Sequence, residues 1–309
     1  MLAAPAAVAT RNSGAEPSLQ TGDQLPINTA GSQVAMRRQQ MMMQVKDRAV
    51  VVTGAGGLGS GRAIALKFSS EGARVVVSDF RDEGGRETVR LIERNRGQGV
   101  FRHADVRIEE EVRSLVAFAE ETFGPVAVLV NNASGPEFLP YDLDRWSETI
   151  QTDLLGAMYA TRFAIDSMRR GGGGAVVNIS STSALGHGRK RPGGMPAYDA
   201  AKAGILRLTT SLSWLATKEK IRVNCLVPDW IARPDLLAYV ESLSSEQRRA
   251  GGVPVKLTTP EEIAGAVLRL ATDESLAGRV LVWQADDEPR LIPWADAGYA
   301  TLDGPFALT

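Results

Sequence analysis

The sequence has little cysteine, little net charge and no long hydrophobic run. Its 309 residues contain one cysteine, Cys225, so an intrachain disulfide is excluded. The sequence contains 35 Lys and Arg residues and 36 Asp and Glu residues, so its net charge is -1. It therefore has no overall positive field that would attract nucleic acid or an anionic membrane. No apolar run reaches the length of a membrane span. We therefore expect a soluble, cytoplasmic protein without nucleic-acid or membrane partners, and Cys225 as a small core residue of a buried strand.

The two ends of the chain differ from its centre. Residues 1–45 are rich in Ala, Ser, Gln, Gly and Thr and have no apolar period, which predicts a disordered or loosely ordered extension. An upstream start codon is an alternative, with Met36 or Met41 to Met43 as the natural start. The tail, 286–309, combines proline with apolar side chains, and we expect it to pack across a subunit interface.

The centre, 46–285, alternates short β-branched runs with helical patterns. Such alternation predicts an α/β fold, a Rossmann-like doubly wound parallel sheet of about seven strands with helices on both faces, in a single domain. In such sheets ligands bind at the carboxyl ends of the strands. The expected strands are 49–52, 74–78, 100–103, 126–130, 175–180, 221–227 and 279–283, and the expected helices are 61–70, 83–95, 109–123, 144–169, 198–218 and 260–272.

A glycine-rich turn follows the first expected strand, and Gly54, Gly56 and Gly59 fit the pattern G-x-G-x-x-G. Glycines there let the backbone approach a pyrophosphate, and the following helix N-terminus favours its charge. Asp79 ends the second strand, where a carboxylate accepts the ribose hydroxyls of NAD and repels the 2′-phosphate of NADP. Arg81 leaves NADP open as the alternative. The predicted contacts in this turn are Gly54, Gly56, Gly57, Leu58, Gly59 and Gly61.

A second motif begins a later helix. Tyr198 and Lys202 are four residues apart and therefore share one helical face. A nearby ammonium lowers the pKa of a phenol from its usual value of about 10, which makes proton exchange near neutrality easier. Ser181 follows the fifth strand, and its hydroxyl could hold a substrate oxygen against the phenol. This trio is a sensible acid–base site for carbonyl reduction; we predict no metal.

These residues, in this order, resemble the classical short-chain dehydrogenase/reductase family over residues 46–283. The resemblance implies that Tyr198 is the general acid/base, that Lys202 assists it and binds the nicotinamide ribose, and that Ser181 orients the substrate oxygen. Family members are usually dimers or tetramers, so we expect a homodimer or homotetramer. The resemblance also implies cofactor contacts from Tyr198, Lys202, Asp105, Val106, Asn131, Asn132, Ala133, Pro228 and Ile231.

The sequence departs from the family pattern at several positions. Asp153 occupies the place of the asparagine of the proton relay, and we include it among the catalytic residues. Ser134 and Asp229 each stand where the family has glycine, and Arg233 where threonine is common. The glycine turn is one residue longer than usual. The segment before Tyr198 is also longer, and its basic residues are expected to be a solvated loop, with a receptor for an acidic substrate as the alternative: His187, Arg189, Lys190 and Arg191.

Together the motifs predict an NAD(H)-dependent oxidoreductase that interconverts a secondary alcohol and a ketone. One alternative is an NADP(H)-dependent biosynthetic ketoreductase. Another is a non-catalytic dinucleotide-binding sensor or scaffold, against which the intact Ser181, Tyr198 and Lys202 argue. Three segments would set the choice of substrate, the last as a helical lid: 134–141, 186–196 and 233–255.

Overall fold

The structure is a computed structural model that describes residues 45–135, 145–185 and 195–294. The predicted extension lies outside these ranges except for Val45, and so do the basic loop residues from His187 to Arg191 and the tail beyond residue 294. The extension and the interface role of the tail therefore stay predictions.

The described residues form one eight-stranded sheet in the order β3-β2-β1-β4-β5-β6-β7-β8. Every neighbouring pair is parallel except β7 and β8, which are antiparallel. This confirms the predicted fold class. The strands are Ala49–Thr53 (β1), Arg74–Asp79 (β2), Gln98–His103 (β3), Val126–Asn131 (β4), Gly174–Ile179 (β5), Ile221–Pro228 (β6), Val280–Trp283 (β7) and Arg290–Leu291 (β8).

Strand β8 was not predicted. It belongs to the tail and pairs with β7 through Leu281 opposite Leu291 and Val282 opposite Arg290. Two residues are too few to show the alternation of apolar and polar side chains that predicts a strand, and both are exposed. The pairing therefore depends on the edge of β7, to which their backbone can bind.

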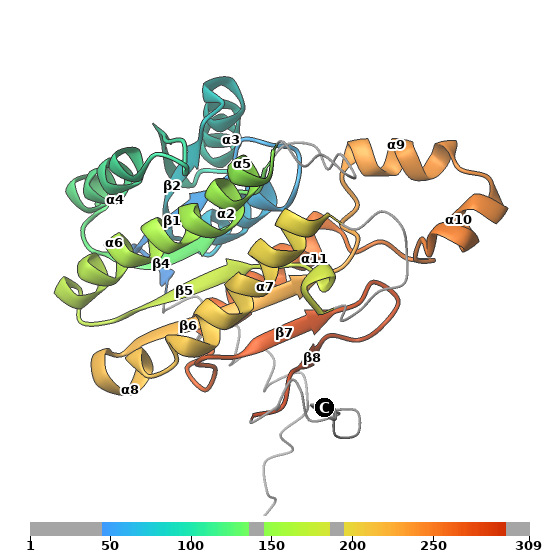
Figure 1. The fold of residues 1–309 in the computed structure, drawn as a ribbon. Coiled ribbons are helices and arrows are strands. Elements are labelled where there is room, and N and C mark those ends of the chain that lie inside the picture. Colours follow the sequence, from blue (N-terminus) through green and yellow to red (C-terminus); the bar gives the residue numbers. More distant parts are fainter. Residues whose placement is uncertain (1–44, 136–144, 186–194, 295–309) are drawn as a thin grey trace, which may run out of the picture. The chain divides into compact units, whose positions relative to one another are not determined.

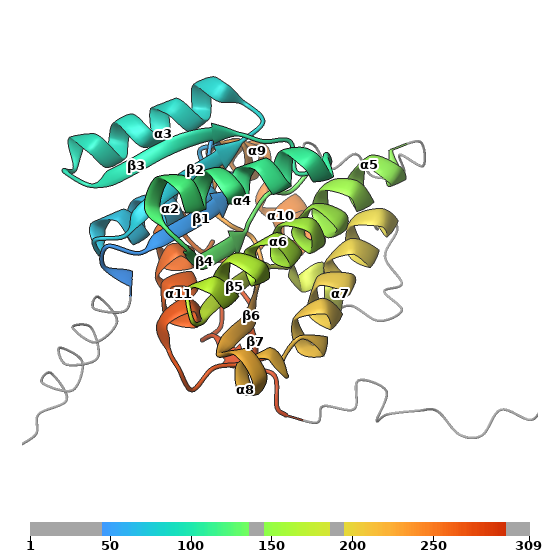
Figure 2. The ribbon, with the colours of Figure 1, turned by 90° about the vertical axis from the view of Figure 1, so that its left-hand side faces the viewer.

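Helices cover both faces of the sheet (Figures 1 and 2). Successive side chains of a strand point to opposite faces, and β1 is buried on both. Val50 and Val52 pack in one apolar cluster with side chains of α2 (Ser60–Ser70), α3 (Asp82–Arg94) and α11 (Pro260–Thr272). Val51 packs on the other face, with α4 (Glu109–Phe123) and α6 (Gly156–Arg170). The centre of the core is therefore the sheet itself, which holds the loops at its carboxyl edge in fixed places.

Two predicted helices are divided. The expected helix 144–169 consists of α5 (Trp146–Ile150), a π-helical turn η1 (Gln151–Leu155) and α6, so Asp153 lies on the π turn. The expected helix 198–218 consists of α7 (Pro196–Ser211) and α8 (Leu215–Glu219). Side chains of α7 pack on β6 and β7, where Cys225 is fully buried as expected, and burial raises the pKa of its thiol to about 12.

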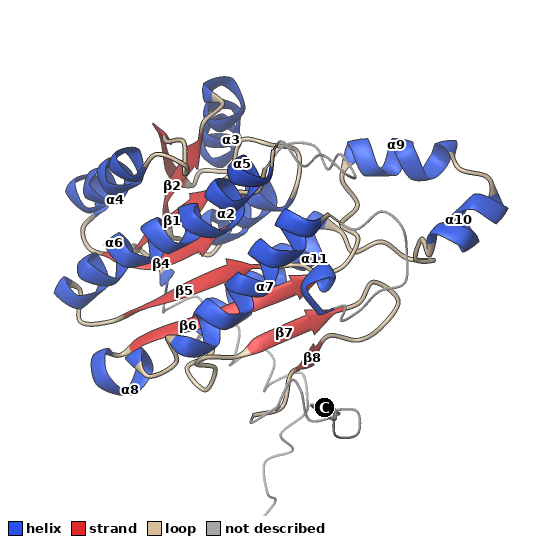
Figure 3. Cartoon of the chain, viewed as in Figure 1, coloured by secondary structure: helices blue, strands red, loops and turns tan. Residues whose placement is uncertain are grey.

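The strand arrows β5, β6 and β7 point to the same edge, beyond which α9 (Pro234–Ser242) and α10 (Ser245–Gly251) lie (Figure 3). These two helices are the predicted helical segment 233–255, and no residue of either is buried. A short 3₁₀ turn, η2 (Thr182–Leu185), follows β5 at the same edge. None of the helices among the described residues is both long and apolar enough to cross a membrane.

Candidate active site

A cleft with a volume of about 1120 Å³ opens at the carboxyl edge of the sheet. The loops that follow β1, β2, β3 and β4 line it, together with Glu148 on α5, Thr152 on the π turn, Arg233 and the first turn of α9. The cleft therefore collects most of the positions predicted to contact a dinucleotide. The predicted residues in its lining are Gly54, Gly56, Gly57, Leu58, Gly59, Gly61, Asp79, Asp105, Val106, Asn132 and Ala133.

Two glycines let the loop after β1 pack tightly against its surroundings. Gly54 has φ +65°, and a Cβ there would lie 2.6 Å from Ala133 Cα. A Cβ on Gly61 would lie 2.2 Å from the Gly54 carbonyl oxygen. Side chains at either position would separate the loop from α2 or from the β4 loop, so these glycines shape the cleft before any ligand is considered.

Polar contacts from the β4 loop hold the glycine loop in place. The Asn132 side-chain amide donates to the carbonyls of Thr53 (3.1 Å) and Gly54 (3.0 Å), and its oxygen accepts from Ser60 Oγ (2.7 Å). The Thr53 hydroxyl oxygen accepts from the backbone N–H groups of Asn132 (3.1 Å) and Ala133 (3.2 Å). Thr53 and Ser60 were not among the predicted contacts, because a lone hydroxyl beside a glycine run gives no distinct sequence signal.

Asp79 lies at the end of β2 as predicted, with a buried carboxylate. Oδ2 accepts from the Gly56 N–H (2.8 Å), and Oδ1 accepts from the Arg81 N–H (2.9 Å). A carboxylate has about four acceptor sites, so two remain for hydroxyl groups in the cleft. The Arg81 guanidinium lies 3.7 Å from Asp79 Oδ1 and is also part of the lining.

The N-terminus of α2 is suited to an anion. Gly59 supplies no side-chain cap, and the first turn of the helix contains no acidic residue. The positive end of the helix macrodipole therefore faces the cleft without a negative partner of its own. The Arg233 side chain lies beside this helix N-terminus: a Cβ added to Gly59 would be 3.1 Å from Arg233 Cδ. A pyrophosphate fits this combination of a helix N-terminus, glycine and guanidinium.

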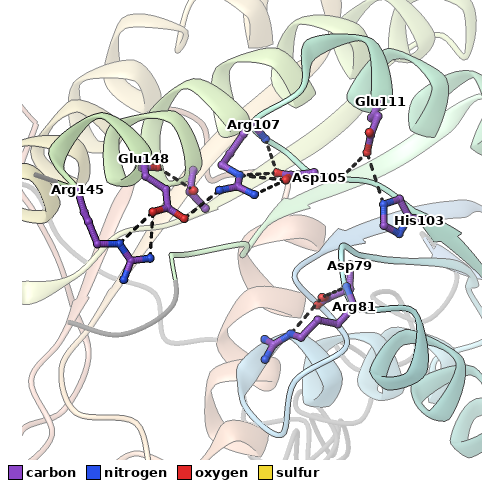
Figure 4. A network of polar contacts seen from close by, with 9 residues as sticks. Asp79, Arg81, His103, Asp105, Arg107, Glu111, Arg145 and Glu148 are labelled. Carbon is purple, nitrogen blue, oxygen red and sulfur yellow. Dashed lines mark hydrogen bonds and ion pairs between the residues drawn. The ribbon is translucent and has the colours of Figure 1, made fainter. Parts of the chain in front are cut away.

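Asp105 belongs to a chain of ion pairs along the cleft wall (Figure 4). Its backbone N–H donates to Glu111, and its carboxylate accepts from the Arg107 guanidinium, Nη2 to Oδ2 at 2.5 Å. Arg107 then reaches Glu148 on α5 (2.9 Å), which pairs with Arg145 (3.0 Å). The bond from Arg107 holds the pKa of the Asp105 carboxyl below its ordinary value, although partial burial opposes this. The network anchors the β3 loop to α5.

Asn131 differs from the expectation. Its side chain is buried and donates to Thr161 Oγ1 (2.9 Å) and Asn178 Oδ1 (2.8 Å) in the interior. It is absent from the lining formed by the described residues of the cleft. Its amide thus joins β4, β5 and α6, and its placement does not support the predicted contact with a cofactor. Alternation along a strand decides this, since neighbouring Asn131 and Asn132 point to different sides.

Tyr198 and Lys202 lie together at the start of α7. The Lys202 ammonium is 5.3 Å from the centre of the Tyr198 ring and donates to the Ile179 carbonyl (3.2 Å). It also pairs with Asp153 Oδ1 at 2.9 Å, and the two side chains are 4% and 1% exposed. Burial by itself lowers the pKa of the ammonium, but the attraction of the Asp153 carboxylate and of the neighbouring Tyr198 oxygen outweighs it, so the pKa is raised.

Ser181 follows β5 and is held by the 3₁₀ turn. Its hydroxyl oxygen accepts from the Ser183 N–H (3.2 Å), and the Thr182 hydroxyl donates to Asp229 Oδ1 (2.9 Å). Asp229, one of the departures from the family pattern, thus ties the β5 loop to the β6 loop. Ile231 lies in the same β6 loop and forms a bridge with Thr258.

The cleft and the Tyr–Lys pair are joined through two further side chains. Ser134 lines the cleft and donates to Asp153 Oδ1 (2.5 Å), and the same carboxylate binds Lys202. Within the described part of the chain, the lining of the cleft itself does not include seven of the predicted residues: Asn131, Asp153, Ser181, Tyr198, Lys202, Pro228 and Ile231. Ser134 and Arg233 line the cleft; the sequence marked them as departures from the family pattern and as the first residues of two segments expected to set the choice of substrate.

No group of three or more His, Cys, Asp or Glu side chains among the described residues is placed to hold a metal ion. Next to the cleft, the described residues bring together a phenol, an ammonium, a hydroxyl and a buried carboxylate. This arrangement can exchange a proton with a substrate oxygen and can bind the phosphates of a dinucleotide.

Comparison with known proteins gives matches along the same region. A family model described as short chain dehydrogenase matches residues 48–262. An uncharacterized oxidoreductase of Thermotoga maritima is 33% identical over 73% of this chain and 90% of its own length. A short chain dehydrogenase/reductase of Aspergillus oryzae is 33% identical over 75% of this chain and 90% of its own.

A solved structure gives a similar fold. It is a 7 alpha-hydroxysteroid dehydrogenase complexed with NADH and 7-oxo glycochenodeoxycholic acid, with a TM-score of 0.71 and 27% sequence identity. The alignment covers 80% of this chain and 96% of that one.

Proposed function

Because this chain belongs to the short chain dehydrogenase family of oxidoreductases, we propose that it interconverts a secondary alcohol and a ketone with NAD(H), and that Tyr198 exchanges the proton. The observation that carries the proposal is the Lys202 ammonium beneath the Tyr198 ring, 5.3 Å from its centre, at the edge that bears the cleft. A tyrosine and a lysine so placed suit acid–base chemistry on a substrate oxygen.

Each residue has a role in this proposal. The bound cofactor supplies or accepts the hydride at the carbinol carbon. Tyr198 gives its proton to the substrate oxygen in reduction and takes it back in oxidation. Ser181 donates a hydrogen bond to that oxygen, and Lys202 holds the phenol and a ribose hydroxyl in place. The helix α2 N-terminus, the glycine loop and Arg233 would hold the pyrophosphate, and Asp79 the adenosine ribose.

The choice of NAD rests on Asp79. Its carboxylate is fixed by two backbone N–H groups and keeps acceptor sites for two ribose hydroxyls. A 2′-phosphate in the same place would meet this negative charge. The solved relative with NADH agrees with this reading. Arg81 supports NADP as a second candidate, since its guanidinium is 64% exposed beside the same carboxylate.

The assembly and place of action are part of the same proposal. We expect a homodimer or homotetramer in the cytoplasm, with a small alcohol or ketone as the substrate. The sensor or scaffold alternative stays open until turnover is measured, although it gives no reason for a phenol and a buried ammonium to lie together.

The test is absorbance at the reduced-nicotinamide band with NADH and NADPH, offered with a panel of ketones and diketones that includes 7-oxo glycochenodeoxycholic acid. Turnover with NADH should fall by at least about 100-fold in Tyr198→Phe, with NADH binding retained. Tyr159→Phe, which removes a hydroxyl on α6, serves as the control. Near-normal turnover in Tyr198→Phe would overturn the mechanism, and tight dinucleotide binding without turnover on any ketone would favour the sensor.

A further inference from the structure

The Asp153 carboxylate is held by three donors. Oδ1 accepts from Ser134 Oγ (2.5 Å) and from the Lys202 ammonium (2.9 Å), and Oδ2 accepts from the Gly135 N–H (3.0 Å). The π turn η1 places Asp153 at this point, with its side chain only 1% exposed. Asp153 and Lys202 therefore form a buried ion pair, which the two further donors hold in place. The Ser134 side chain and the Gly135 backbone thus fix a negative charge next to Lys202.

This pair changes the electrostatic environment of Tyr198. A lone ammonium beside a phenol attracts the phenolate and so promotes loss of the proton. Here the ammonium lies 2.9 Å from a carboxylate oxygen and 5.3 Å from the centre of the phenol ring. The pair carries no net charge, and its attraction for a phenolate is correspondingly weaker.

Other titratable groups on neighbouring elements do not restore a positive charge. Cys225 on β6 is buried, and its pKa is raised to about 12, so it is a neutral thiol. Glu148 on α5 is paired with Arg107 and Arg145, and Asp229 after β6 is bound by Thr182. Asp199 on α7 itself adds negative charge rather than positive. Two further cations lie on these elements: the Arg222 guanidinium on β6 donates to the Leu270 and Ala271 carbonyls of α11, and Arg207 on α7 is exposed. Among the described residues, Lys202 is therefore the cation beside the Tyr198 ring, and Asp153 balances its charge.

We propose that Asp153 is a positioning residue that keeps Tyr198 protonated through Lys202, so that the enzyme works near neutral pH as a carbonyl reductase, an inference that rests on the proposed function above. In that direction hydride from NADH forms the new C–H bond at the carbonyl carbon. The C=O π electrons move to oxygen, which takes the Tyr198 proton. The ketone is reduced to the alcohol, NADH is oxidised to NAD⁺, and the phenolate regains its proton from water. Alcohol oxidation needs the phenolate and so requires higher pH.

The first test needs no substrate. The protein is labelled with tyrosine carrying ¹³C at the ζ position and loaded with NADH, and the Tyr198 resonance is identified by its loss in Tyr198→Phe. Asp153→Asn keeps the shape of the side chain and removes the charge. Its Tyr198 resonance should titrate at least about one pH unit lower than in the wild type. A midpoint that is unchanged or higher in Asp153→Asn overturns the inference.

Two controls separate the charge from the packing. Asp166→Asn removes a carboxylate that pairs with Arg169 on the outside of α6, and it should leave the midpoint unchanged. Ser134→Ala removes a hydrogen bond to Asp153 but not its charge, so its shift should be smaller than that of Asp153→Asn. An equal shift in Ser134→Ala would mean that packing, not charge, is responsible. If the Asp153→Asn variant does not fold, the double variant Ser134→Gly/Asp153→Asn makes the same change of charge. The Tyr198 resonance is then titrated in the double variant instead.

The second test uses a ketone and alcohol pair from the panel. In Asp153→Asn the pH midpoint of alcohol oxidation should move down with the resonance, while reduction at pH 7 should not increase. A protein with no turnover on any pair would overturn the proposed function, but the resonance titration would still decide the role of Asp153. The two failures are thus distinguishable.

Discussion

The Asn132 side chain joins the ends of β1 and β4. Its amide nitrogen lies 3.0 Å from the Gly54 carbonyl oxygen. Among the described residues that line the cleft, Gly54 is the one with a positive φ. A second bond reaches Thr53 O at 3.1 Å. Asn132 therefore sets the geometry of the glycine loop from outside the loop itself.

We expect Asn132→Ala to lower the free energy of unfolding by about 1–3 kcal/mol, because two partly buried carbonyls lose their donor. NADH binding should weaken as well, since the loop loses its support. Urea unfolding and fluorescence titration with NADH measure the two effects. Asn95→Ala, at the exposed end of α3, is the matched control and should change neither. Unchanged stability in Asn132→Ala would count against this role.

Asp79→Asn should raise the affinity for NADPH relative to NADH, because it removes a negative charge without removing the side chain. In this variant the amide oxygen can still accept from the Gly56 N–H, whereas the Arg81 N–H loses its acceptor. Titrations with both dinucleotides give the ratio. Arg81→Ala is the partner experiment: if Arg81 binds a 2′-phosphate, it should weaken NADPH alone. A wild-type protein that already prefers NADPH would contradict the assignment of NAD.

Arg233→Ala should raise the Kd for NADH by about tenfold or more, since a bond between a charged donor and a phosphate contributes about 1.5–3 kcal/mol. In the structure the guanidinium pairs with Asp235 (3.0 Å). Adenosine, which has no phosphate, should bind equally to both proteins. Arg249→Ala on α10 removes an exposed cation away from the cleft lining and should have no effect. Equal losses for adenosine and NADH would exclude a phosphate contact.

The Asp105–Arg107 pair should stabilise the protein in a pH-dependent way. The bond from Arg107 lowers the pKa of Asp105 in the folded state below its ordinary value of 3.8. A lowered folded pKa means stability that is present above the unfolded pKa and is lost as pH falls through the folded one. Below about pH 4, unfolding free energy should therefore fall less steeply in Asp105→Asn than in the wild type. Asp287→Asn, an exposed acid, should keep the wild-type slope.

The sequence predicted the parts of the fold that have a period. The β-branched runs gave seven strands, and the predicted helices 109–123 and 260–272 coincide with α4 and α11. In α11 a capping box between Thr259 and Glu262 with Pro260 in the first turn fixes the start locally. The positions of Tyr198 and Lys202 were predictable for the same reason, because i and i+4 on a helix are neighbours whatever the helix packs against.

Long-range contacts were not predictable in this way. The π turn at Gln151–Leu155 has no local signature, yet it places Asp153 on Lys202, which is 49 positions later in the chain. Ser134 and Arg233 were predicted as departures from the family pattern and as parts of substrate-setting segments, but their partners Asp153 and Gly59, which are distant in the sequence, were not predicted. Asn131 and Asn132 are adjacent, but the Asn131 side chain binds Asn178 in the core, whereas the Asn132 side chain binds the Gly54 carbonyl beside the cleft.

By itself the sequence determined the order of strands and helices, the glycine turn, the acid at the end of β2 and the Tyr–Lys spacing, because each depends on residues that are close in the chain. Only the tertiary structure decided which carboxylate meets Lys202, which cation lies over the glycine loop and which asparagine faces the cleft. Those outcomes depend on how the strand ends meet at one edge of the sheet, and a buried charge takes its properties from the partners that packing brings to it.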